Sequence, residues 1–318
     1  MILRGIDFGP IWFGSGTVGF FGEGYWYHNL FKWLPGFDLS QITFVAKTTT
    51  LEKKDGNMPL KEDRITPAES KPRCIKVNLL QGATLNAVGL SGPGARWLFD
   101  QGSWQNRPKP FFLSFMAVSK KSSGRLEELV GFVSLAKEKM QGSKAKWGLQ
   151  INFSCPNVGL EVGELLSEVE DSLDIAAELN VPLVPKFNLS LPPLAAKKIS
   201  LHPACDAIHI SNTLPFGKLE GLVPNWEKLF GEESPLEDLG GGGLSGPALF
   251  PLVQNWLNQT ILEVPSCPIN AGGGIFSRQN VDTLFNYGAH GISISTVIMH
   301  RPWRVLGIVE EAYKRRRS

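Results

Sequence analysis

The sequence predicts an α/β fold: a single (β/α)8 TIM barrel over residues 1–318, with one doubly wound sheet as the alternative arrangement. Short apolar runs alternate along the chain with longer segments of helical period. No change of composition divides the 318 residues, of which 42% are hydrophobic and 19% charged. Because α/β barrels commonly exceed about 250 residues in one domain, this length predicts one domain rather than two.

The predicted strands are short runs that are apolar at nearly every position. Continuous apolarity, rather than alternation with polar residues, is typical of parallel strands covered on both faces of their sheet. Such runs, rich in β-forming residues, occupy residues 42–46, 111–115, 148–153, 181–184, 207–210, 267–270 and 291–294.

The predicted helices lie between these runs. Apolar residues recur there at spacings of three and four, which places one face of a helix on the sheet. These apolar stripes occupy residues 126–136, 165–176, 249–257 and 281–285.

Two long segments fit neither a strand nor a helix. Residues 53–81 are polar and contain proline, and residues 214–243 contain proline and end in four glycines. Long irregular segments in a compact domain are usually functional or disordered. We therefore expect the first to be an inserted loop or lid near the C-terminal face of the barrel.

The composition argues against several classes of partner. The formal net charge is +2 without a large block of one sign, so neither nucleic acid nor a membrane surface is expected. No apolar run reaches about 18 residues and no secretion signal is recognisable, which predicts a cytoplasmic protein. The four cysteines form no C-x-x-C pair, so no metal site is predicted.

The N-terminal region is rich in aromatic residues, which include Trp12, Tyr25, Trp26 and Tyr27. We expect these rings to pack in the core. A partner surface is the alternative use.

Polar residues follow several predicted strands. In a barrel, all such positions converge on the C-terminal face, where active sites lie. Taken singly, each residue would be a surface lysine or a loop polar group with local partners. Together they predict a site formed by Lys47, Asn152, Cys155, Asn157, Lys186, Asn212 and Thr213.

Glycine-rich turns follow the last strands and predict a phosphate site. Residues 271–274 (AGGG) follow one strand, and Ser295 and Thr296 follow the next. Both stretches precede helical segments, where exposed backbone N–H groups bind anions. Residues 243–246 (GLSG) are expected to add a third contact before a helix that opens at Pro247. We expect a mononucleotide cofactor.

Cys155 is the candidate general base. A lone cysteine is more often a small buried apolar residue. Cys155, however, lies between Ser154 and Pro156 at a strand end, with Asn152 and Asn157 beside it. A thiol in cationic or hydrogen-bonding surroundings can accept a proton. The other three cysteines lack such neighbours and are predicted to be structural.

Several motifs, in order, resemble those of the dihydroorotate dehydrogenases. The resemblance spans nearly the whole chain, and an ordered set is far more specific than any one motif. The matching stretches are residues 14–20 (GSGTVGF), 47–52 (KTTTLE), 85–90 (LNAVGL), 152–158 (NFSCPNV), 212–213 (NT), 242–246 (GGLSG) and 272–274 (GGG).

The resemblance implies FMN-dependent oxidation of dihydroorotate to orotate in pyrimidine biosynthesis. Cys155 would remove the C5 proton while a hydride leaves C6 for flavin N5, and Lys47 would contact both ligands. The residues implied for the substrate are Lys47, Asn86, Gly89, Leu90, Asn152, Asn157, Asn212 and Thr213. Those implied for FMN are Ser15, Gly16, Lys47, Thr48, Asn152, Lys186, Ser245, Gly246, Gly273, Gly274, Ser295 and Thr296.

The resemblance also implies a subclass and partners. With a cysteine at the position of the base, the chain resembles the soluble class. The first two motifs are closest to the subclass partnered by an iron–sulfur flavoprotein that passes electrons to NAD, and a homodimer is expected. The alternatives are a dihydropyrimidine dehydrogenase-like enzyme for another pyrimidine, a flavin-binding scaffold subunit, and a phosphosugar barrel without flavin.

Overall fold

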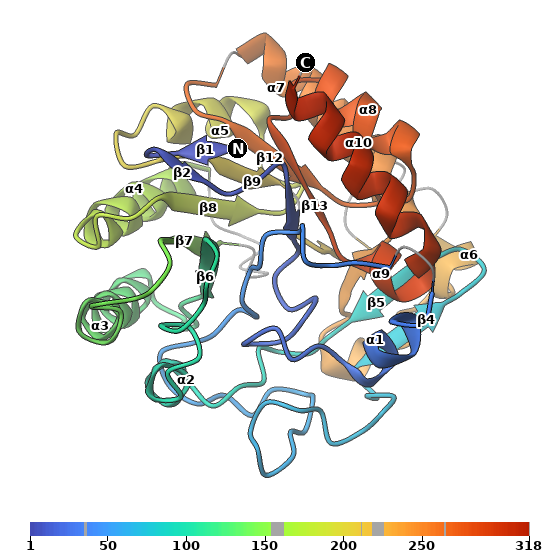
Figure 1. The fold of residues 1–318 in the computed structure, drawn as a ribbon, viewed down its shortest axis with the longest axis horizontal. Coiled ribbons are helices and arrows are strands. Elements are labelled where there is room, and N and C mark those ends of the chain that lie inside the picture. Colours follow the sequence, from blue (N-terminus) through green and yellow to red (C-terminus); the bar gives the residue numbers. More distant parts are fainter. Residues whose placement is uncertain (35–36, 154–161, 211, 218–225, 264, 318) are drawn as a thin grey trace.

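A curved sheet of parallel strands forms the centre of the molecule (Figure 1). The computed structural model describes residues 1–34, 37–153, 162–210, 212–217, 226–263 and 265–317. Within them, the strands of this sheet lie in the spatial order β3 (Ile11–Phe13), β13 (Gly291–Ile294), β12 (Ile269–Gly272), β9 (Ile208–Ile210), β8 (Leu183–Phe187), β7 (Trp147–Asn152) and β6 (Phe111–Phe115).

Residues 43–49 close this sheet into a barrel, because they bond to its first and its last strand. On the β3 side, the Thr43 N–H donates to the Ile11 carbonyl at 2.9 Å. On the β6 side, the Phe112 N–H donates to the Phe44 carbonyl at 3.0 Å. The strand predicted here therefore occupies a strand position, although it pairs through isolated parallel bridges rather than a continuous ladder.

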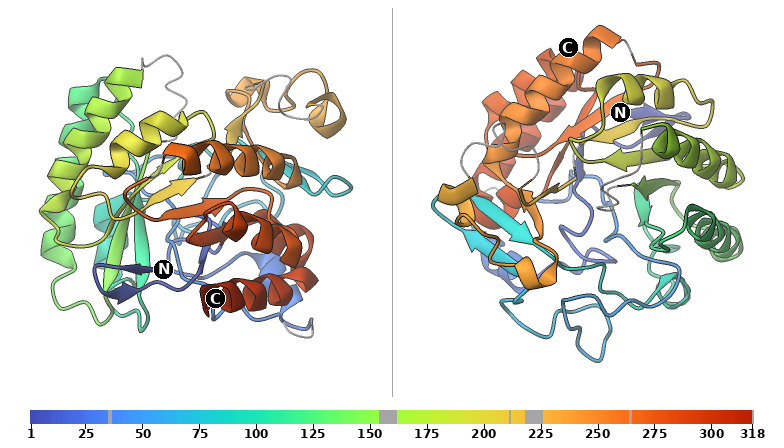
Figure 2. Two further views of the ribbon diagram at one scale, coloured as in Figure 1. Left: turned by 90° about the horizontal axis from the view of Figure 1, so that it is seen from above. Right: turned by 180° about the vertical axis from the view of Figure 1, so that it is seen from behind.

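Helices cover the outer face of the barrel (Figures 1 and 2). The predicted apolar stripes coincide with four of them and pack toward the strands, as where Phe132 of α3 stacks on Phe115 of β6, although Val130 of the first stripe is 48% exposed. The (β/α)8 prediction is thereby confirmed. The longer helices are α3 (Ser122–Lys139), α4 (Val162–Ala177), α5 (Pro193–Ser200), α7 (Phe250–Glu263), α8 (Arg278–Asn286) and α10 (Val305–Arg317). The short ones are α1 (Trp26–Phe31), α2 (Ala95–Asp100), α6 (Trp226–Phe230), α9 (Thr296–His300), and the 3-10 turns η1 (Glu237–Leu239), η2 (Pro247–Leu249) and η3 (Pro302–Arg304).

A small antiparallel sheet lies on the opposite side of the molecule from α3 and α4 (Figure 2). It was not predicted, because its strands fall within or beside the stretches taken as loops. Residues 243–246, expected as a loop, begin with one of these strands, and the helical turn η2 precedes α7. The strands, in spatial order, are β10 (Leu214–Pro215), β11 (Gly243–Ser245), β5 (Ala83–Asn86) and β4 (Ile75–Asn78).

Aromatic side chains fill the N-terminal end of the barrel. Phe8 and Phe112 stack with their ring centroids 4.2 Å apart, and the Trp12 ring lies 4.5 Å from that of Phe112. Trp12 Nε1 donates to the Phe8 carbonyl at 2.9 Å, which satisfies the polar atom of a fully buried ring. Because this end is packed, the barrel offers a ligand site at its C-terminal end.

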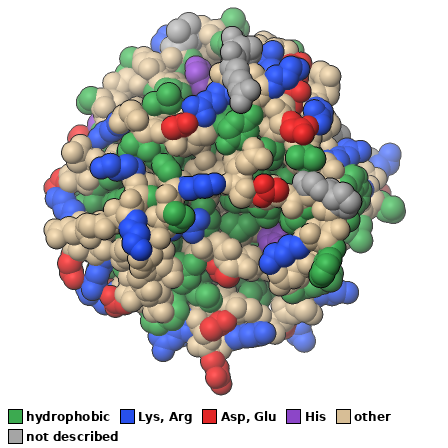
Figure 3. Space-filling model, viewed as in Figure 1, with side chains coloured by type: hydrophobic (Ala, Val, Ile, Leu, Met, Phe, Trp, Pro, Cys, Tyr) green, Lys and Arg blue, Asp and Glu red, His purple; other side chains and the backbone are tan. Residues whose placement is uncertain are grey.

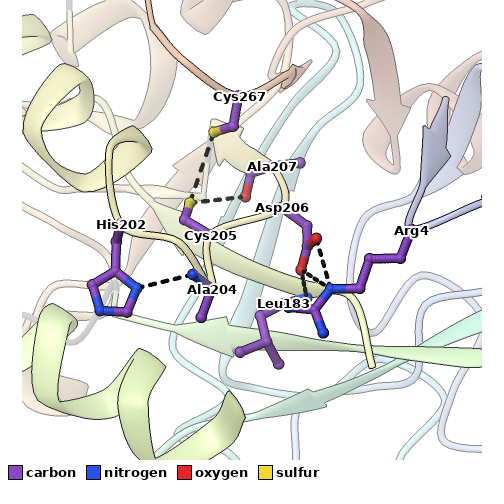
Figure 4. A network of polar contacts seen from close by, with 8 residues as sticks. All are labelled: Arg4, Leu183, His202, Ala204, Cys205, Asp206, Ala207 and Cys267. Atoms are coloured by element: carbon purple, nitrogen blue, oxygen red, sulfur yellow. Dashed lines mark hydrogen bonds and ion pairs between the residues drawn. The ribbon is translucent and has the colours of Figure 1, made fainter. Parts of the chain in front are cut away.

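The N-terminal hairpin of β1 (Ile2–Leu3) and β2 (Ile6–Asp7) is tied to the start of β8 (Figure 4). Arg4 Nε, in the turn of the hairpin, donates to both carboxylate oxygens of Asp206, at 2.8 and 3.0 Å. The same carboxylate accepts the backbone N–H of Leu183 at 2.9 Å. One side chain thus links the hairpin to the first residue of a barrel strand.

The cysteines that the structure describes are buried, in agreement with a structural role. Cys205 Sγ lies 3.7 Å from Cys267 Sγ at the N-terminal end of the barrel (Figure 4), and Cys74 is fully buried. The hydrogen bond with Cys267, together with burial, raises the pKa of Cys205 well above its ordinary value. Cys205 therefore stays a thiol at neutral pH. Cys155 lies outside the described residues.

Lysine and arginine side chains are dispersed over the face seen in Figure 3, interspersed with acidic ones. This distribution agrees with the small net charge of +2. Among the described helices, none has the length and apolarity needed to cross a bilayer.

Candidate active site

A large cavity opens at the C-terminal ends of the barrel strands. Its volume is about 1440 Å³. Cys155 and Asn157 fall outside the described part of the chain. The predicted site residues that the structure does describe all line this cavity: Ser15, Gly16, Lys47, Thr48, Asn86, Gly89, Leu90, Asn152, Lys186, Asn212, Thr213, Ser245, Gly246, Gly273, Gly274, Ser295 and Thr296.

Two buried lysines reach the cavity from different parts of the barrel. Lys47 Nζ donates to the Ser91 carbonyl at 2.7 Å and lies 4.7 Å from the centre of the Phe20 ring. Lys186 lies on β8, one residue before its end, and 5% of its surface is exposed. Burial lowers the pKa of each from 10.5 to about 8. An anionic or electron-rich ligand above them would favour their charged forms.

Side-chain amides form a second part of the wall. Asn152 is the last residue of β7, and its Oδ1 accepts a hydrogen bond from Asn212 Nδ2 at 3.0 Å. Asn212 Oδ1 accepts the backbone N–H of Thr213 at 2.9 Å. On the antiparallel sheet, Asn86 Nδ2 donates to the Gly243 carbonyl at 3.3 Å. These bonds orient amides that can recognise a small polar ring.

The loop after β3 is fixed by hydroxyl groups. Ser15 Oγ donates to the Ala46 carbonyl and lies 2.8 Å from Thr48 Oγ1, which in turn lies 2.9 Å from Ser114 Oγ. The glycine spacing of residues 14–19 (GSGTVG) matches the dinucleotide pattern G-x-G-x-x-G. That pattern needs a helix to begin at the motif, whereas residues 15–21 form turns here.

Glycines from two loops meet at the position expected for a phosphate. Gly246, Gly273 and Gly274 have φ of 124°, 102° and 77°, which L side chains rarely adopt. A Cβ on Gly274 would lie 2.7 Å from the Phe250 N and 2.8 Å from the Gly246 carbonyl oxygen, so the loops touch. Ser295 and Thr296, at the start of α9, line the same part of the cavity. Convergent backbone of this kind suits an anion.

Sequence reasoning missed several residues of this region. Thr17 Oγ1 lies 2.7 Å from Ser295 Oγ and so joins the first loop to the last. Ser293 also lines the cavity. Ser293 could have been found, because strand alternation places it opposite the apolar Ile292 and Ile294.

The prediction for the N-terminal aromatic residues was partly wrong. Trp12 is fully buried in the core, as expected. Trp26, by contrast, is 53% exposed, although it and Tyr27 line the cavity. Core packing therefore describes Trp12 and not Trp26.

The fold and the site together define a cofactor-dependent barrel enzyme. Its glycine cradle for phosphate, two buried lysines and oriented amides all lie at the C-terminal end of the (β/α)8 barrel. The family model for dihydroorotate dehydrogenase matches residues 17–314, and the chain belongs to this family of oxidoreductases.

The similar proteins agree with this assignment. The catalytic subunit of dihydroorotate dehydrogenase B (NAD(+)) of Caldicellulosiruptor saccharolyticus is 29% identical, over 97% of this chain and 91% of that protein. Dihydroorotate dehydrogenase A (fumarate) of Lactobacillus helveticus is 27% identical, over 97% of this chain and 90% of its own. A crystal structure of the Eimeria tenella dihydroorotate dehydrogenase with ferulenol has the same fold, with a TM-score of 0.67 at 16% identity, over 98% of this chain and 82% of that one.

Enzymes of this family depend on FMN, and the cavity fits that cofactor. Its volume of about 1440 Å³ exceeds the roughly 300–1,000 Å³ of ordinary small-molecule sites, which leaves room for a second ligand beside a mononucleotide. The glycine loops match a phosphate, and the buried lysines match a ring that gains negative charge on reduction.

Proposed function

We propose that this chain oxidises dihydroorotate to orotate with FMN, as a single-domain cytoplasmic enzyme of pyrimidine biosynthesis. The observation that carries the proposal is the arrangement of one cavity. Two buried lysines and an amide array lie in the same cavity as a glycine cradle for phosphate. The cradle suits the cofactor, and the amides suit a pyrimidine with its carboxylate.

FMN, when bound, would supply the hydride acceptor for the oxidation of dihydroorotate. Cys155 removes the C5 proton as a general base, a contribution of roughly 10²–10⁴ in rate. Lys47 contacts both ligands, and the substrate carboxylate favours its charged form, since burial alone lowers its pKa to about 8. Lys186 would hold the flavin ring and balance negative charge there.

The remaining predicted residues position the two ligands. Positioning alone accounts for a large part of such rate enhancements, because the reacting atoms are held together in advance. Ser15, Gly16 and Thr48 would line the flavin ring, and the phosphate end would be held by Ser245, Gly246, Gly273, Gly274, Ser295 and Thr296. The pyrimidine and its carboxylate are held by Asn86, Gly89, Leu90, Asn152, Asn157, Asn212 and Thr213.

The electrons are proposed to leave through an iron–sulfur flavoprotein partner, bound to a homodimer of this chain. Several relatives are named as catalytic subunits of NAD(+) enzymes, which supports a partner. Trp26, Leu30 and Trp33, on and after α1, are 53%, 60% and 89% exposed, and the first two line the cavity. Exposed apolar groups of this kind are typical of interaction surfaces.

The proposed reaction is tested by mixing the yellow protein with L-dihydroorotate without oxygen and following the oxidised-flavin absorbance. Rapid bleaching is expected with dihydroorotate and not with dihydrouracil. Cys155→Ala should keep its flavin but lose the bleaching, and dithionite should still reduce it. Bleaching by dihydrouracil alone would assign the site to another pyrimidine.

The proposed partner is tested with the same reduced protein. If electrons leave through a partner, neither NAD nor fumarate reoxidises the isolated chain quickly, although a small artificial dye does. Rapid reoxidation by fumarate would instead assign the chain to the class that needs no partner.

A further inference from the structure

A line of hydrogen-bonded side chains crosses the barrel beneath the cavity. Gln150 of β7 places its Nε2 2.7 Å from His209 Nδ1, on β9. His209 Nε2 lies 2.8 Å from Ser293 Oγ, on β13. Gln150 and His209 are fully buried and do not line the cavity, whereas Ser293 does. The line therefore runs from the barrel interior to the ligand space.

The direction of these hydrogen bonds follows from their chemistry. An amide N–H can only donate, so His209 Nδ1 is the acceptor of the Gln150 bond. The ring proton of a neutral imidazole then sits on Nε2, which donates to Ser293 Oγ. With its oxygen already accepting this bond, Ser293 has its own hydroxyl proton available for an acceptor in the cavity.

The surroundings of His209 keep its ring neutral. Burial, together with the charge of Lys186, the register partner of His209 on β8, lowers the pKa of His209 well below the ordinary value. On another side, the Trp12 ring meets the imidazole edge-on at a centroid distance of 6.2 Å. The groups packed against the imidazole thus include one cation, one aromatic ring, the neutral Gln150 and Ser293, and Asn270, its buried register partner on β12. No acid among the described residues hydrogen-bonds or forms an ion pair with it.

The neighbouring backbone makes room for the serine hydroxyl. A Cβ on Gly272, the register partner of Ser293 on β12, would lie 2.2 Å from Ser293 Oγ. Any side chain there would displace the hydroxyl. Gly272 therefore has a role separate from that of Gly273 and Gly274 in the phosphate cradle.

We propose that Ser293 is a further FMN-binding residue, which donates a neutral hydrogen bond to an acceptor atom of the flavin ring, and that His209 and Gln150 are positioning residues for it. The inference rests on the proposed function, since it takes FMN as the ligand of the cavity. Such a donor, which lines the same cavity as Lys186, favours the reduced flavin, because the reduced ring carries more negative charge.

The test compares Ser293→Ala with the unaltered flavoprotein by two measurements that need no substrate. Loss of one hydrogen bond should weaken FMN binding about fivefold, measured as fluorescent FMN released on dilution. It should also shift the equilibrium between the flavin and a redox dye toward oxidised flavin, on the order of threefold. An unchanged dye equilibrium would overturn the proposal, even if FMN binding weakened.

Variants of the second residue separate positioning from packing. His209→Leu removes the donor without touching the cavity, and it should shift the dye equilibrium as Ser293→Ala does. His209→Gln keeps both a donor and an acceptor, so its dye equilibrium should return most of the way to that of the unaltered protein. A packing effect alone would not explain such a return. If the leucine variant does not fold, the glutamine and alanine variants still decide the matter.

A control comes from Ser200 of α5, which is equally buried but remote from the cavity. Its Oγ donates to the Lys197 carbonyl and accepts the Ser266 N–H. Ser200→Ala should lower stability and leave the dye equilibrium unchanged. A preparation that binds no flavin at all would contradict the proposed function, whereas a flavoprotein indifferent to Ser293→Ala would contradict only this inference.

Discussion

Lys186 holds its ammonium group inside the barrel, where 5% of the residue surface is exposed. Burial lowers its pKa from 10.5 to about 8, and Lys47 shows the same shift. A difference of this size corresponds to about 3 kcal/mol between the two protonation states. In the protein without FMN, the charged lysines therefore oppose folding. The site is built for a ligand at the expense of stability.

The pH dependence of this penalty has a definite sign. Because the folded pKa lies below the unfolded one, the folded state binds fewer protons between pH 8 and pH 10.5. Stability therefore rises with pH across that window, and the penalty is fully present below pH 8. For Lys186 it amounts to about 3 kcal/mol at pH 7 and less than about 1 kcal/mol at pH 10.

Lys186→Met should consequently stabilise the FMN-free protein at pH 7 by about 2–3 kcal/mol, because it removes the buried charge. The gain should shrink toward pH 10. Urea unfolding of both proteins at the two pH values measures it, and the difference between them cancels the titration of other groups. A variant less stable than the unaltered protein at pH 7 would show that the charged ammonium group does not oppose folding.

At the scale of elements, helices α3 and α4 are joined by a buried ion pair. Arg125 Nε donates to Glu168 Oε1 at 2.6 Å, and its second terminal nitrogen bonds the other carboxylate oxygen. Arg125 Nη1 also donates to the carbonyls of Ser119 and Lys120 in the loop after β6. Both charged side chains are about nine-tenths buried. The pair thus fixes two helices and one loop together.

Arg125→Met should destabilise the protein by about 3–5 kcal/mol, because it leaves the Glu168 carboxylate buried without its partner. The double variant Arg125→Met/Glu168→Leu should recover most of this loss, since no buried charge remains. Denaturant unfolding of the single and double variants completes the cycle. A double variant as unstable as Arg125→Met alone would mean that the loop carbonyls, rather than the charge, dominate.

Elements were predictable from the sequence where their apolar pattern is long. The stripes on α3, α4, α7 and α8 follow from helical periodicity, and the runs of β6 and β13 follow from their nearly continuous apolarity. The strands β10 and β11 span two and three residues and lie in glycine- and proline-rich stretches, and β3 spans three, so no apolar run marked them. The antiparallel sheet depends on pairing between segments far apart in the chain, and no local pattern encodes that pairing.

For the whole molecule, the cavity was predictable because barrel geometry brings strand ends together whatever their separation in sequence. Lys47, Asn152 and Asn212 each follow or end a strand, so their meeting needed only the fold class. The line from Gln150 through His209 to Ser293 was not predictable. Each of these residues is a polar residue inside an apolar run, and their contacts depend on the stagger of the strands.

Binding of FMN should stabilise the entire fold, because the cavity wall comes from loops at both ends of the chain. A ligand present at about 100 times its dissociation constant adds about 2.7 kcal/mol, so the melting temperature should rise with the FMN concentration. Riboflavin, which lacks the phosphate, should raise it less if the glycine loops hold that group.

Gly274→Ala forces a side chain into a backbone with φ of 77° and against the Gly246 carbonyl. This variant should bind FMN and riboflavin with nearly equal effect on the melting temperature. If the two flavins stabilised the unaltered protein equally, the glycine loops would not be the binding site of the phosphate.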